Sequence, residues 1–449
     1  MAQIGCRRGR GRGGASAVSE VLRVGFLNVR GMVAEVKRKE VEEMCKERNL
    51  NVLALNETKL KGKGEMVLGN FKGYYSGVSM RVRGREGVAL VMKEEFWNCI
   101  SDVGLVNSRL MWVKIRLGSE KWVFVSVYGP VNGGGGEGEC EGFWEGLDEC
   151  LRNFERGTKL CVLGDFNARV GKRGNTEVLG PFGIDGINEN GERMVEMCES
   201  RGLIIGNTWF KKKSIHKMTW VSGVNGEGGI LDYICVGRDD RSRLLDVNVQ
   251  RGAAGGISDH YLVVAKLRVL KGGRVRERMG GGDGVEIVRV ERLEDDRMAE
   301  EYRRKMAEKW EMKRGCMEEG VEDEWRVFKE ALLEVARDVC GVKRVGGRKR
   351  RRQEFWWNDE VKEIVQKKRE RFLCYLRSSG DEKMDEWEDY KDVRREVKRV
   401  VARSKKRAND EWCINVANEF RDNSKKFWKE VNGVRKKNIE TNKRIKLST

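Results

Sequence analysis

Short apolar runs in the first 270 residues alternate with polar turns and a few longer amphipathic stretches. The apolar runs are rich in Val, Ile, Leu and aromatic residues, as is typical of β-strands. Strands are predicted over 21–29, 49–57, 87–92, 110–117, 121–129, 158–166, 201–207, 217–221, 229–237 and 261–269, and helices over 33–48, 139–156 and 190–201. Many strands with few helices between them predict an α/β fold, a four-layer sandwich of two packed mixed β-sheets flanked by helices.

The pattern changes after residue 270. A glycine-rich stretch, 271–290, leads into helical patterns dense in Glu, Lys and Arg that run from 291 to 449. We therefore expect one domain over 20–270, a linker over 271–290 and a mostly α-helical basic arm. The first 19 residues are rich in Gly and Arg and are expected to be a disordered tail.

Three tryptophans of the arm, Trp356, Trp357 and Trp428, recur within amphipathic patterns. This spacing favours packing between helices over stacking on nucleic-acid bases. The Lys and Arg faces of the arm remain candidates for binding RNA or DNA phosphates without sequence preference.

Charge narrows the class of partner. The 449 residues carry a formal net charge of +19, which favours a polyanion such as nucleic acid or an anionic membrane surface, unless the excess Lys and Arg only keep the surface solvated. The run "GRKRRR" (347–352) fits nuclear import, a phosphate-binding patch or a solvated linker. No 18-residue apolar run and no secretory signal is visible, so an intracellular protein, located in the nucleus and without a membrane partner, is expected.

The twelve cysteines are scattered and form no CxxC pair, which argues against a zinc finger and against a secreted disulfide framework. Cys161 and Cys235 lie inside apolar runs, so we expect them to be reduced residues of buried strands.

Acidic and amide residues recur just past the ends of apolar strands. These residues are Asn28, Glu57, Asp165, Asn167, Asp232, Asp259 and His260. Any one of them could be an ordinary turn residue. Strand ends are also where a layered α/β fold gathers functional side chains, and so many at once favour a site.

Asp232 interrupts an otherwise apolar strand, and a buried carboxylate is costly without a partner. A histidine is a natural partner, because one ring nitrogen can face the carboxylate while the other faces a substrate. The chain has two histidines, His216 and His260. His216 lies in a basic connection with no adjacent acid and is expected at the surface, whereas His260 follows Asp259 and is the candidate partner.

Most of these positions fall within a set of motifs that occur in a characteristic order. They are "LNVRGM", "LALNETK", "VSVYGP", "VLGDFNARVG", "IIGNTWF", "MTWVSG", "ILDYICV" and "ISDHY". Together they resemble the endonuclease/exonuclease/phosphatase superfamily, and most closely the apurinic-like endonuclease of LINE-type, non-LTR retrotransposons. The resemblance covers roughly residues 20–270. It is specific because all the motifs occur together and in order, whereas "GDFN" or "SDH" alone would be weak evidence for the family.

The resemblance implies a metal-dependent endonuclease that leaves a DNA strand nicked with a free 3′-hydroxyl. Glu57 would be the main ligand of a divalent metal, Mg²⁺ or alternatively Mn²⁺, with Asn28 beside it and Asp259 near the metal. Mg²⁺ prefers oxygen ligands and needs only one or two protein carboxylates when a substrate supplies phosphate oxygens.

The resemblance also implies the catalytic roles. Asp165 would orient and deprotonate the attacking water, while Asn167 and Tyr128 would bind the phosphate. His260, oriented by Asp232, would stabilise the charge that develops on the phosphate, and its carboxylate partner would keep it protonated.

Arg30 stands where apurinic repair enzymes usually carry an acid, two residues after the first-strand Asn, and this weakens an abasic-site repair function. Contacts with nucleic acid are expected from Arg30, Lys59, Asn207 and Trp220. Residues 219–233 resemble a hairpin, since Gly and Asn punctuate two β-rich runs, and such a hairpin would either enter a DNA groove or be an ordinary loop.

The arm resembles the helical linker that follows the endonuclease in retrotransposon proteins, where a reverse transcriptase would come next. The chain contains no (F/Y)xDD polymerase signature, so we expect a truncated element protein with DNA, and element RNA on the arm, as partners. Two alternatives remain: an RNA-directed nuclease or deadenylase of the same superfamily, and a domesticated nucleic-acid-binding protein without activity. The oligomeric state is not predicted.

Overall fold

Two β-sheets form the centre of the N-terminal domain. The computed structural model describes residues 18–131, 137–172, 176–221, 228–271, 285–314, 321–345, 355–378, 380 and 382–422. The first sheet has seven strands in the spatial order β14 (Leu244–Gln250), β15 (Leu262–Lys271), β1 (Val18–Asn28), β2 (Val52–Asn56), β5 (Val88–Lys93), β4 (Phe71–Ser76) and β3 (Lys63–Leu68). The second has six, in the order β10 (Leu203–Ile205), β13 (Asp232–Gly237), β9 (Lys159–Asp165), β8 (Glu120–Tyr128), β7 (Leu110–Leu117) and β6 (Ile100–Asn107).

Both sheets are mixed. β1 and β2 are parallel, as are β8 and β9, and the remaining neighbours in the two sheets are antiparallel. Side chains at alternate positions, such as Val24 and Phe26 of β1 and Phe124 of β8, are fully buried between the sheets.

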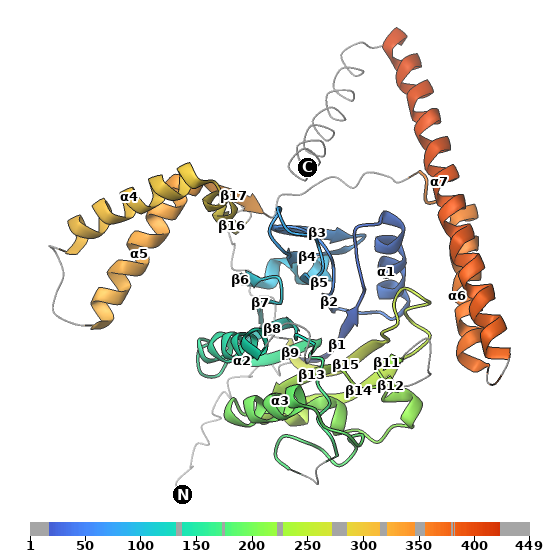
Figure 1. The fold of residues 1–449 in the computed structure, drawn as a ribbon, viewed down its shortest axis with the longest axis horizontal. Coiled ribbons are helices and arrows are strands. Elements are labelled where there is room, and N and C mark those ends of the chain that lie inside the picture. The colour runs from blue at the N-terminus through green and yellow to red at the C-terminus, as the bar shows by residue number, and fades with distance from the viewer. Residues whose placement is uncertain are drawn as a thin grey trace, which may run out of the picture.

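Helices cover the outer faces of both sheets (Figure 1). α1 (Glu35–Glu47) buries Val41 and Met44 against the first sheet, and α2 (Glu137–Arg152) and α3 (Glu189–Ser200) bury residues such as Leu147 and Met194 against the second. The predicted four-layer sandwich of two mixed sheets flanked by helices is therefore confirmed. Cys161 and Cys235 are free and buried in β9 and β13, as expected.

Four strands of the sheets were not predicted: β3, β4, β6 and β14. Three of them, β3, β6 and β14, lie at the edges of their sheets. Edge strands bury less apolar surface than central ones, so their sequences need no continuous apolar run. The other short elements of the domain are η1 (Glu94–Cys99), η2 (Gly206–Thr208), η3 (Ser214–His216), η4 (Arg238–Arg243), β11 (Trp220–Val221) and β12 (Gly228–Gly229).

The region after the domain forms two helical hairpins. The first contains η5 (Val290–Glu294), α4 (Asp296–Arg314) and α5 (Val321–Cys340), together with the antiparallel pair β16 (Val285–Val288) and β17 (Val342–Val345). β16 lies inside the stretch 271–290 that was expected to be a linker. The predicted tail and the run at 347–352 lie outside the described residues, except that Val18 and Ser19 begin β1.

The second hairpin contains α6 (Asp359–Arg377) and α7 (Glu382–Asp422). Trp356 is buried with Val361 and Val397 between the two helices, and the ring of Trp357 meets that of Trp356 at 5.6 Å and 81°. These two tryptophans pack helices as predicted, while Trp428 lies outside the described residues. No helix in the described part of the chain is both long and apolar enough to span a membrane.

The α6–α7 hairpin does not stand apart from the domain. It lies along α1 (Figure 1), where Lys368 of α6 forms an ion pair with Glu40 and Lys405 of α7 one with Glu35. A deeper contact, made by aromatic residues of both helices, reaches the loop between β14 and β15.

Candidate active site

Strand register brings the predicted site residues to one edge of the two sheets. In the second sheet, Asp165 at the end of β9 lies between Tyr128 of β8 and Asp232 of β13, because the register pairs it with both. In the first sheet, the parallel strands β1 and β2 end side by side at Asn28 and Asn56, and Glu57 follows directly.

The amide of Asn28 connects the two sheets. Its Nδ2 donates to Oε1 of Glu57 at 3.0 Å and to Oδ2 of Asp165 at 2.9 Å. Its Oδ1 accepts from the backbone N–H of Arg30 at 3.1 Å. The hydroxyl of Tyr128 donates to the same Glu57 oxygen at 3.2 Å. Asn28 and Tyr128 therefore hold the two carboxylates in place.

His260 and Asp232 form a buried pair. Nδ1 of His260 lies 3.0 Å from each carboxylate oxygen of Asp232, and Asp232 is fully buried. Nε2 of the same ring faces Oδ2 of Asp165 at 3.9 Å, too far for a hydrogen bond. The pairing expected from the sequence is present, and the second ring nitrogen points into the site.

Burial and neighbouring charges move two pKa values toward neutrality or above it. Burial, reinforced by the charge of Asp232, raises the pKa of Asp165 to about 7. Burial by itself lowers the pKa of His260, but the charges of Asp232 and Asp165 outweigh it and raise that pKa to about 9. Near neutral pH the imidazole is therefore a cation, and Asp165 exchanges a proton readily.

Asn167 anchors the loop after β9. Its backbone N–H donates to Oδ1 of Asp165 at 3.1 Å, and its Nδ2 donates to the carbonyl of Gly129 at 2.9 Å. Asn188, which also caps α3, donates to the carbonyl of Asn167 at 3.0 Å. These contacts fix the position of Asn167 beside Asp165.

Backbone strain is concentrated here. Of the five non-glycine residues with positive φ in the described part of the chain, four lie in or beside the site: Arg30, Glu57, Lys59 and Asn167. A non-glycine residue in this conformation costs on the order of 1–3 kcal/mol, and such residues cluster at functional sites.

Arg30 forms an ion pair with Asp259 across the mouth of the site. The carboxylate of Asp259 is partly buried, which raises its pKa, but His260 and Arg30 outweigh this and lower it. Asp259, predicted to lie near a metal, thus has a cation as its direct neighbour.

The predicted nucleic-acid contacts differ in their surroundings. The side chain of Arg30 is 54% exposed, and Nζ of Lys59 lies 3.6 Å from Glu57. Trp220 is half-buried in β11, next to His260 in the backbone pairing. Asn207 is buried, and its amide donates to the carbonyl of Asp232 at 3.0 Å and accepts from the N–H of Ile234 at 3.0 Å. Its contact with nucleic acid stays a prediction.

The predicted hairpin at 219–233 is present at its base, where Trp220 pairs with Gly229 and Val221 with Gly228. Residues 222–227 of its tip lie outside the described residues. His216 is exposed in η3, as expected.

Thr219 was missed by sequence reasoning. This fully buried residue accepts hydrogen bonds on Oγ1 from the N–H groups of Leu231 and Asp232, at 3.0 and 3.1 Å. Its carbonyl accepts from the N–H of Tyr261 at 2.7 Å. Thr219 thus links Asp232 to the segment that carries His260. No local sequence pattern indicates this role. Asn188, by contrast, could have been found as the polar residue just before the predicted helix at 190–201.

The donor set of the site is suited to a hard cation. Glu57 and Asp165 offer carboxylate oxygens and Asn28 an amide oxygen, which Mg²⁺ and Mn²⁺ favour. Ligand atoms of Asp165, Asp232 and His260 also lie within 4.8 Å of one another. Because His260 is cationic near neutral pH and faces Asp165, the oxygens of Glu57 are the better place for a cation.

Two curated proteins are similar in sequence to about half of this chain. Craniofacial development protein 2 of Bos taurus is 32% identical over 250 residues, which is 55% of this chain and 41% of that protein. The same protein of Tragulus javanicus is 31% identical over 250 residues, 55% of this chain and 42% of its own length. The match spans about two fifths of these relatives, and no family model matches the chain.

Solved structures with a similar backbone include AP endonuclease LMAP of Leishmania major, with 17% identity, a TM-score of 0.44 and coverage of 56% of this chain and 88% of that one. The endonuclease domain of TRAS1, a telomere-specific non-LTR retrotransposon, has 17% identity, a TM-score of 0.39 and coverage of 55% and 99%. The fold is established by the two sheets and their register, and not by these neighbours.

Proposed function

We propose that this protein is a metal-dependent DNA endonuclease that leaves a nick with a free 3′-hydroxyl, as in target-primed retrotransposition. The observation that carries the proposal is the cluster of Glu57, Asp165 and the His260–Asp232 pair at one sheet edge, with Asn28 linking the two carboxylates. The motifs that contribute these residues also resemble LINE-type endonucleases, which gives the same assignment.

Asp165 is the proposed general base. A base with a pKa near the working pH takes up a proton efficiently, and the pKa of Asp165 is raised to about 7 by burial and by Asp232. It accepts a proton from the water that attacks phosphorus. The P–O3′ bond breaks, the 3′ oxygen takes a proton from solvent water and leaves as a hydroxyl, and the phosphate stays on the 5′ side.

His260 is the proposed stabiliser of the phosphate charge. Its Nε2 faces the site while Nδ1 is held by Asp232, so the imidazolium N–H is already aimed before substrate binds. Tyr128 and Asn167 are placed at the same edge, and their side chains can turn from Glu57 and Gly129 to a phosphate oxygen.

Glu57 would hold Mg²⁺ or Mn²⁺, together with Asn28 if its amide turns its oxygen inward, which leaves Asp165 to act as the base. A bound cation of this kind supplies charge neutralisation at the phosphate oxygens. Asp259, neutralised by Arg30, contributes less to cation binding than its position in the sequence suggests.

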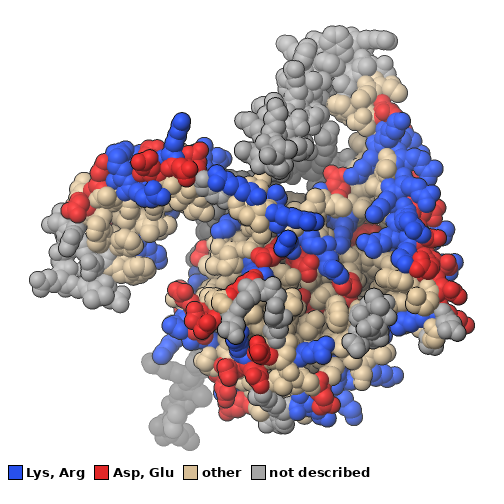
Figure 2. All heavy atoms as spheres, in the orientation of Figure 1, with Lys and Arg blue, Asp and Glu red and all other residues tan. Residues whose placement is uncertain are grey.

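DNA is the proposed substrate, and the exposed Arg30 and the half-buried Lys59 beside the site are suited to contact its backbone. Lys and Arg side chains also gather along α7, interspersed with acidic ones (Figure 2). This surface is the proposed contact for element RNA. A net charge of +19 supports a polyanionic partner.

Nicking of supercoiled plasmid by the full chain tests the function. We expect relaxation in Mg²⁺ or Mn²⁺, no relaxation in EDTA, and nicks that a DNA polymerase extends without prior phosphatase treatment. Asp165→Ala and His260→Ala should abolish nicking, whereas His216→Ala, an exposed histidine, should not. Unchanged nicking in EDTA and in both site variants would refute the assignment.

Two other outcomes distinguish the alternative functions. Shortening of poly(A) RNA in preference to plasmid nicking would identify a deadenylase-like enzyme. DNA binding without cleavage of either substrate would identify a domesticated binding protein.

A nuclear location is proposed from the basic run at 347–352. A fluorescent fusion of the full chain should accumulate in the nucleus, and replacing the Arg and Lys residues of the run with Ser should redistribute it to the cytoplasm. Equal distribution of both fusions would contradict this proposal.

A further inference from the structure

The α6–α7 hairpin covers the loop between β14 and β15 at three glycines. A Cβ added to Gly252 would lie 3.0 Å from Cδ2 of Leu373, and one on Gly255 would lie 2.9 Å from Cγ of Arg369. A Cβ on Gly256 would lie 2.6 Å from the hydroxyl of Tyr390. Gly255 and Gly256 also have φ of 49° and 76°, which favours glycine.

Tyr390 makes the central contact. Its hydroxyl donates to the carbonyl oxygen of Gly256 at 2.9 Å, and its side chain is buried. Its ring packs against Phe372 of α6 at a centroid distance of 5.3 Å. Both aromatic residues join the same buried apolar cluster as Tyr261, the residue that follows His260.

Ion pairs hold the hairpin in this position. Arg369, whose stem covers Gly255, donates through Nη1 to both carboxylate oxygens of Glu47 on α1, at 2.8 and 2.7 Å. Together with the buried pair between Lys368 and Glu40, this fastens α6 to the domain on the side from which the loop is covered.

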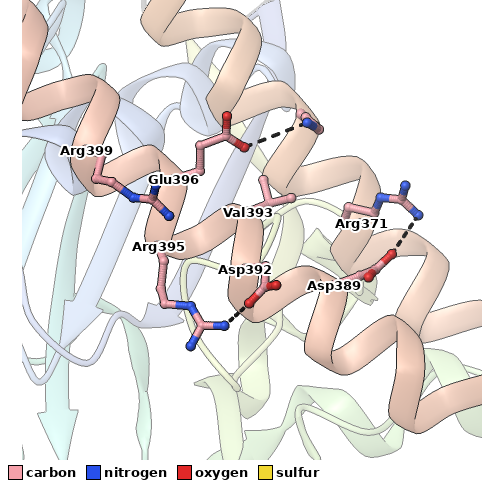
Figure 3. A pocket seen from close by; sticks show the side chains of 8 residues that line it. Arg371, Asp389, Asp392, Val393, Arg395, Glu396 and Arg399 are labelled. Atoms are coloured by element: carbon pink, nitrogen blue, oxygen red, sulfur yellow. Dashed lines mark ion pairs between the residues drawn. The ribbon is translucent and has the colours of Figure 1, made fainter.

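The groove between α6 and α7 is lined mainly by charged side chains that pair with one another. This hollow of about 570 Å³ is lined by charged residues that pair across it, including Arg371 with Asp389 at 3.3 Å and Lys367 with Glu396 at 3.7 Å (Figure 3). The pairs of Lys367 and Arg371 join the two helices to each other, while Arg395 pairs with Asp392 within α7.

The covered loop leads directly into the site. Ala253, Ala254 and Ile257 are buried against the first sheet, and the N–H of Ile257 donates to the carbonyl of Ala254 at 2.7 Å. The N–H of His260 then donates to Oγ of Ser258 at 3.2 Å. A shift of the loop at Gly256 therefore moves the backbone four residues before His260.

We propose that the α6–α7 hairpin is a working part of the active site, in which Tyr390 is a positioning residue that holds the loop 251–258 so that Asp259 and His260 reach the site. The expected effect on the nicking rate rests on the proposed nuclease function. The expected effect on the position of His260 does not. The second hairpin of the arm thus acts as a support for catalysis, in addition to any contact with nucleic acid.

The test uses full-length Tyr390→Phe, which keeps the ring and removes the hydroxyl, in a His216→Gln background where His260 gives the sole imidazole signal. We expect the His260 imidazole resonances to shift, and kcat for plasmid nicking to fall about tenfold with KM within about twofold, because misplacement of a catalytic group lowers kcat. Tyr375→Phe is the matched control, since the Tyr375 hydroxyl makes no hydrogen bond among the described residues, and it should change neither readout.

Unchanged His260 resonances and unchanged kcat in Tyr390→Phe would overturn the proposal. If circular dichroism shows that Tyr390→Phe does not fold, the same two measurements are made on Arg369→Met. This variant loosens α6 over Gly255 and leaves Tyr390 intact, so the same changes are expected. If the unsubstituted protein does not nick DNA at all, the proposed function fails, yet the His260 resonances still decide whether the hairpin positions the loop.

Discussion

Nδ1 of His260 lies 3.0 Å from both carboxylate oxygens of Asp232, in a pocket from which water is largely excluded. Because burial alone would lower the pKa of this imidazole, the carboxylate is what keeps it protonated. The charge state of the site near neutral pH thus depends chiefly on Asp232, with a smaller contribution from Asp165, although Asp232 touches no substrate in the proposed mechanism.

Replacing Asp232 with Asn should therefore leave the His260 imidazole neutral near pH 7. We expect its pKa to fall by several units and nicking at pH 7 to fall at least about 100-fold, the range typical of losing a charged catalytic group. Histidine NMR in the His216→Gln background measures the pKa. Asp240→Asn is the control, because Asp240 is also a buried carboxylate paired with a cation but lies away from the site, and it should leave nicking unchanged.

The pH dependence of stability follows from the same pair. The folded-state pKa of His260, about 9, lies above its unfolded value of 6.5. Its contribution is therefore present in full below pH 6.5, fades as the pH rises, and is lost above about 9; it amounts to about 3 kcal/mol. Urea unfolding at pH 6 and pH 9.5 should show this loss in the native chain and in His216→Gln. A His260→Gln variant that loses as much stability over this range would contradict the assignment.

Arg30 should weaken cation binding at the site, because it pairs with Asp259 and brings a positive charge to the carboxylates. Arg30→Glu removes that charge and adds an acid, so we expect affinity for Mn²⁺ to rise about tenfold, a gain of about 1.4 kcal/mol. Calorimetric titration of Mn²⁺ measures this. Lys362→Glu, the same charge change on exposed α6, should have no effect, and equal gains in both variants would mean that only net charge matters.

Thr219 should be needed for the conformation of the site. Thr219→Val keeps the shape but removes the acceptor of the buried N–H group of Asp232 and of the part-buried N–H group of Leu231, which costs on the order of 1–3 kcal/mol. The free energy of unfolding and the nicking rate should both fall. Thr219→Ser retains the hydroxyl and should preserve nicking. Equal stability of the Val variant and the native chain would show that the hydroxyl is dispensable.

Local patterns were sufficient for much of the fold. Central strands that bury both faces were predicted because each needs a continuous apolar run, as in Val52–Asn56 and Val88–Lys93. The inner strand Phe71–Ser76, whose burial is interrupted, was missed. Edge strands such as Ile100–Asn107 were missed because exposed positions interrupt their apolar residues. The hairpin β16–β17 was missed because Val285–Val288 is a very short strand beside a glycine-rich stretch.

The sequence by itself determined which polar residues stand at strand ends, since an Asp inside an apolar strand and a histidine after a glycine pair are local signals. Only the tertiary structure decided how they meet: that Asn28 joins Glu57 to Asp165, that Arg30 neutralises Asp259, and that Tyr390 lies on Gly256. The physical reason is separation along the chain. Tyr390 and Gly256 are 134 residues apart, and no pattern within one strand or helix encodes a contact between two such distant elements.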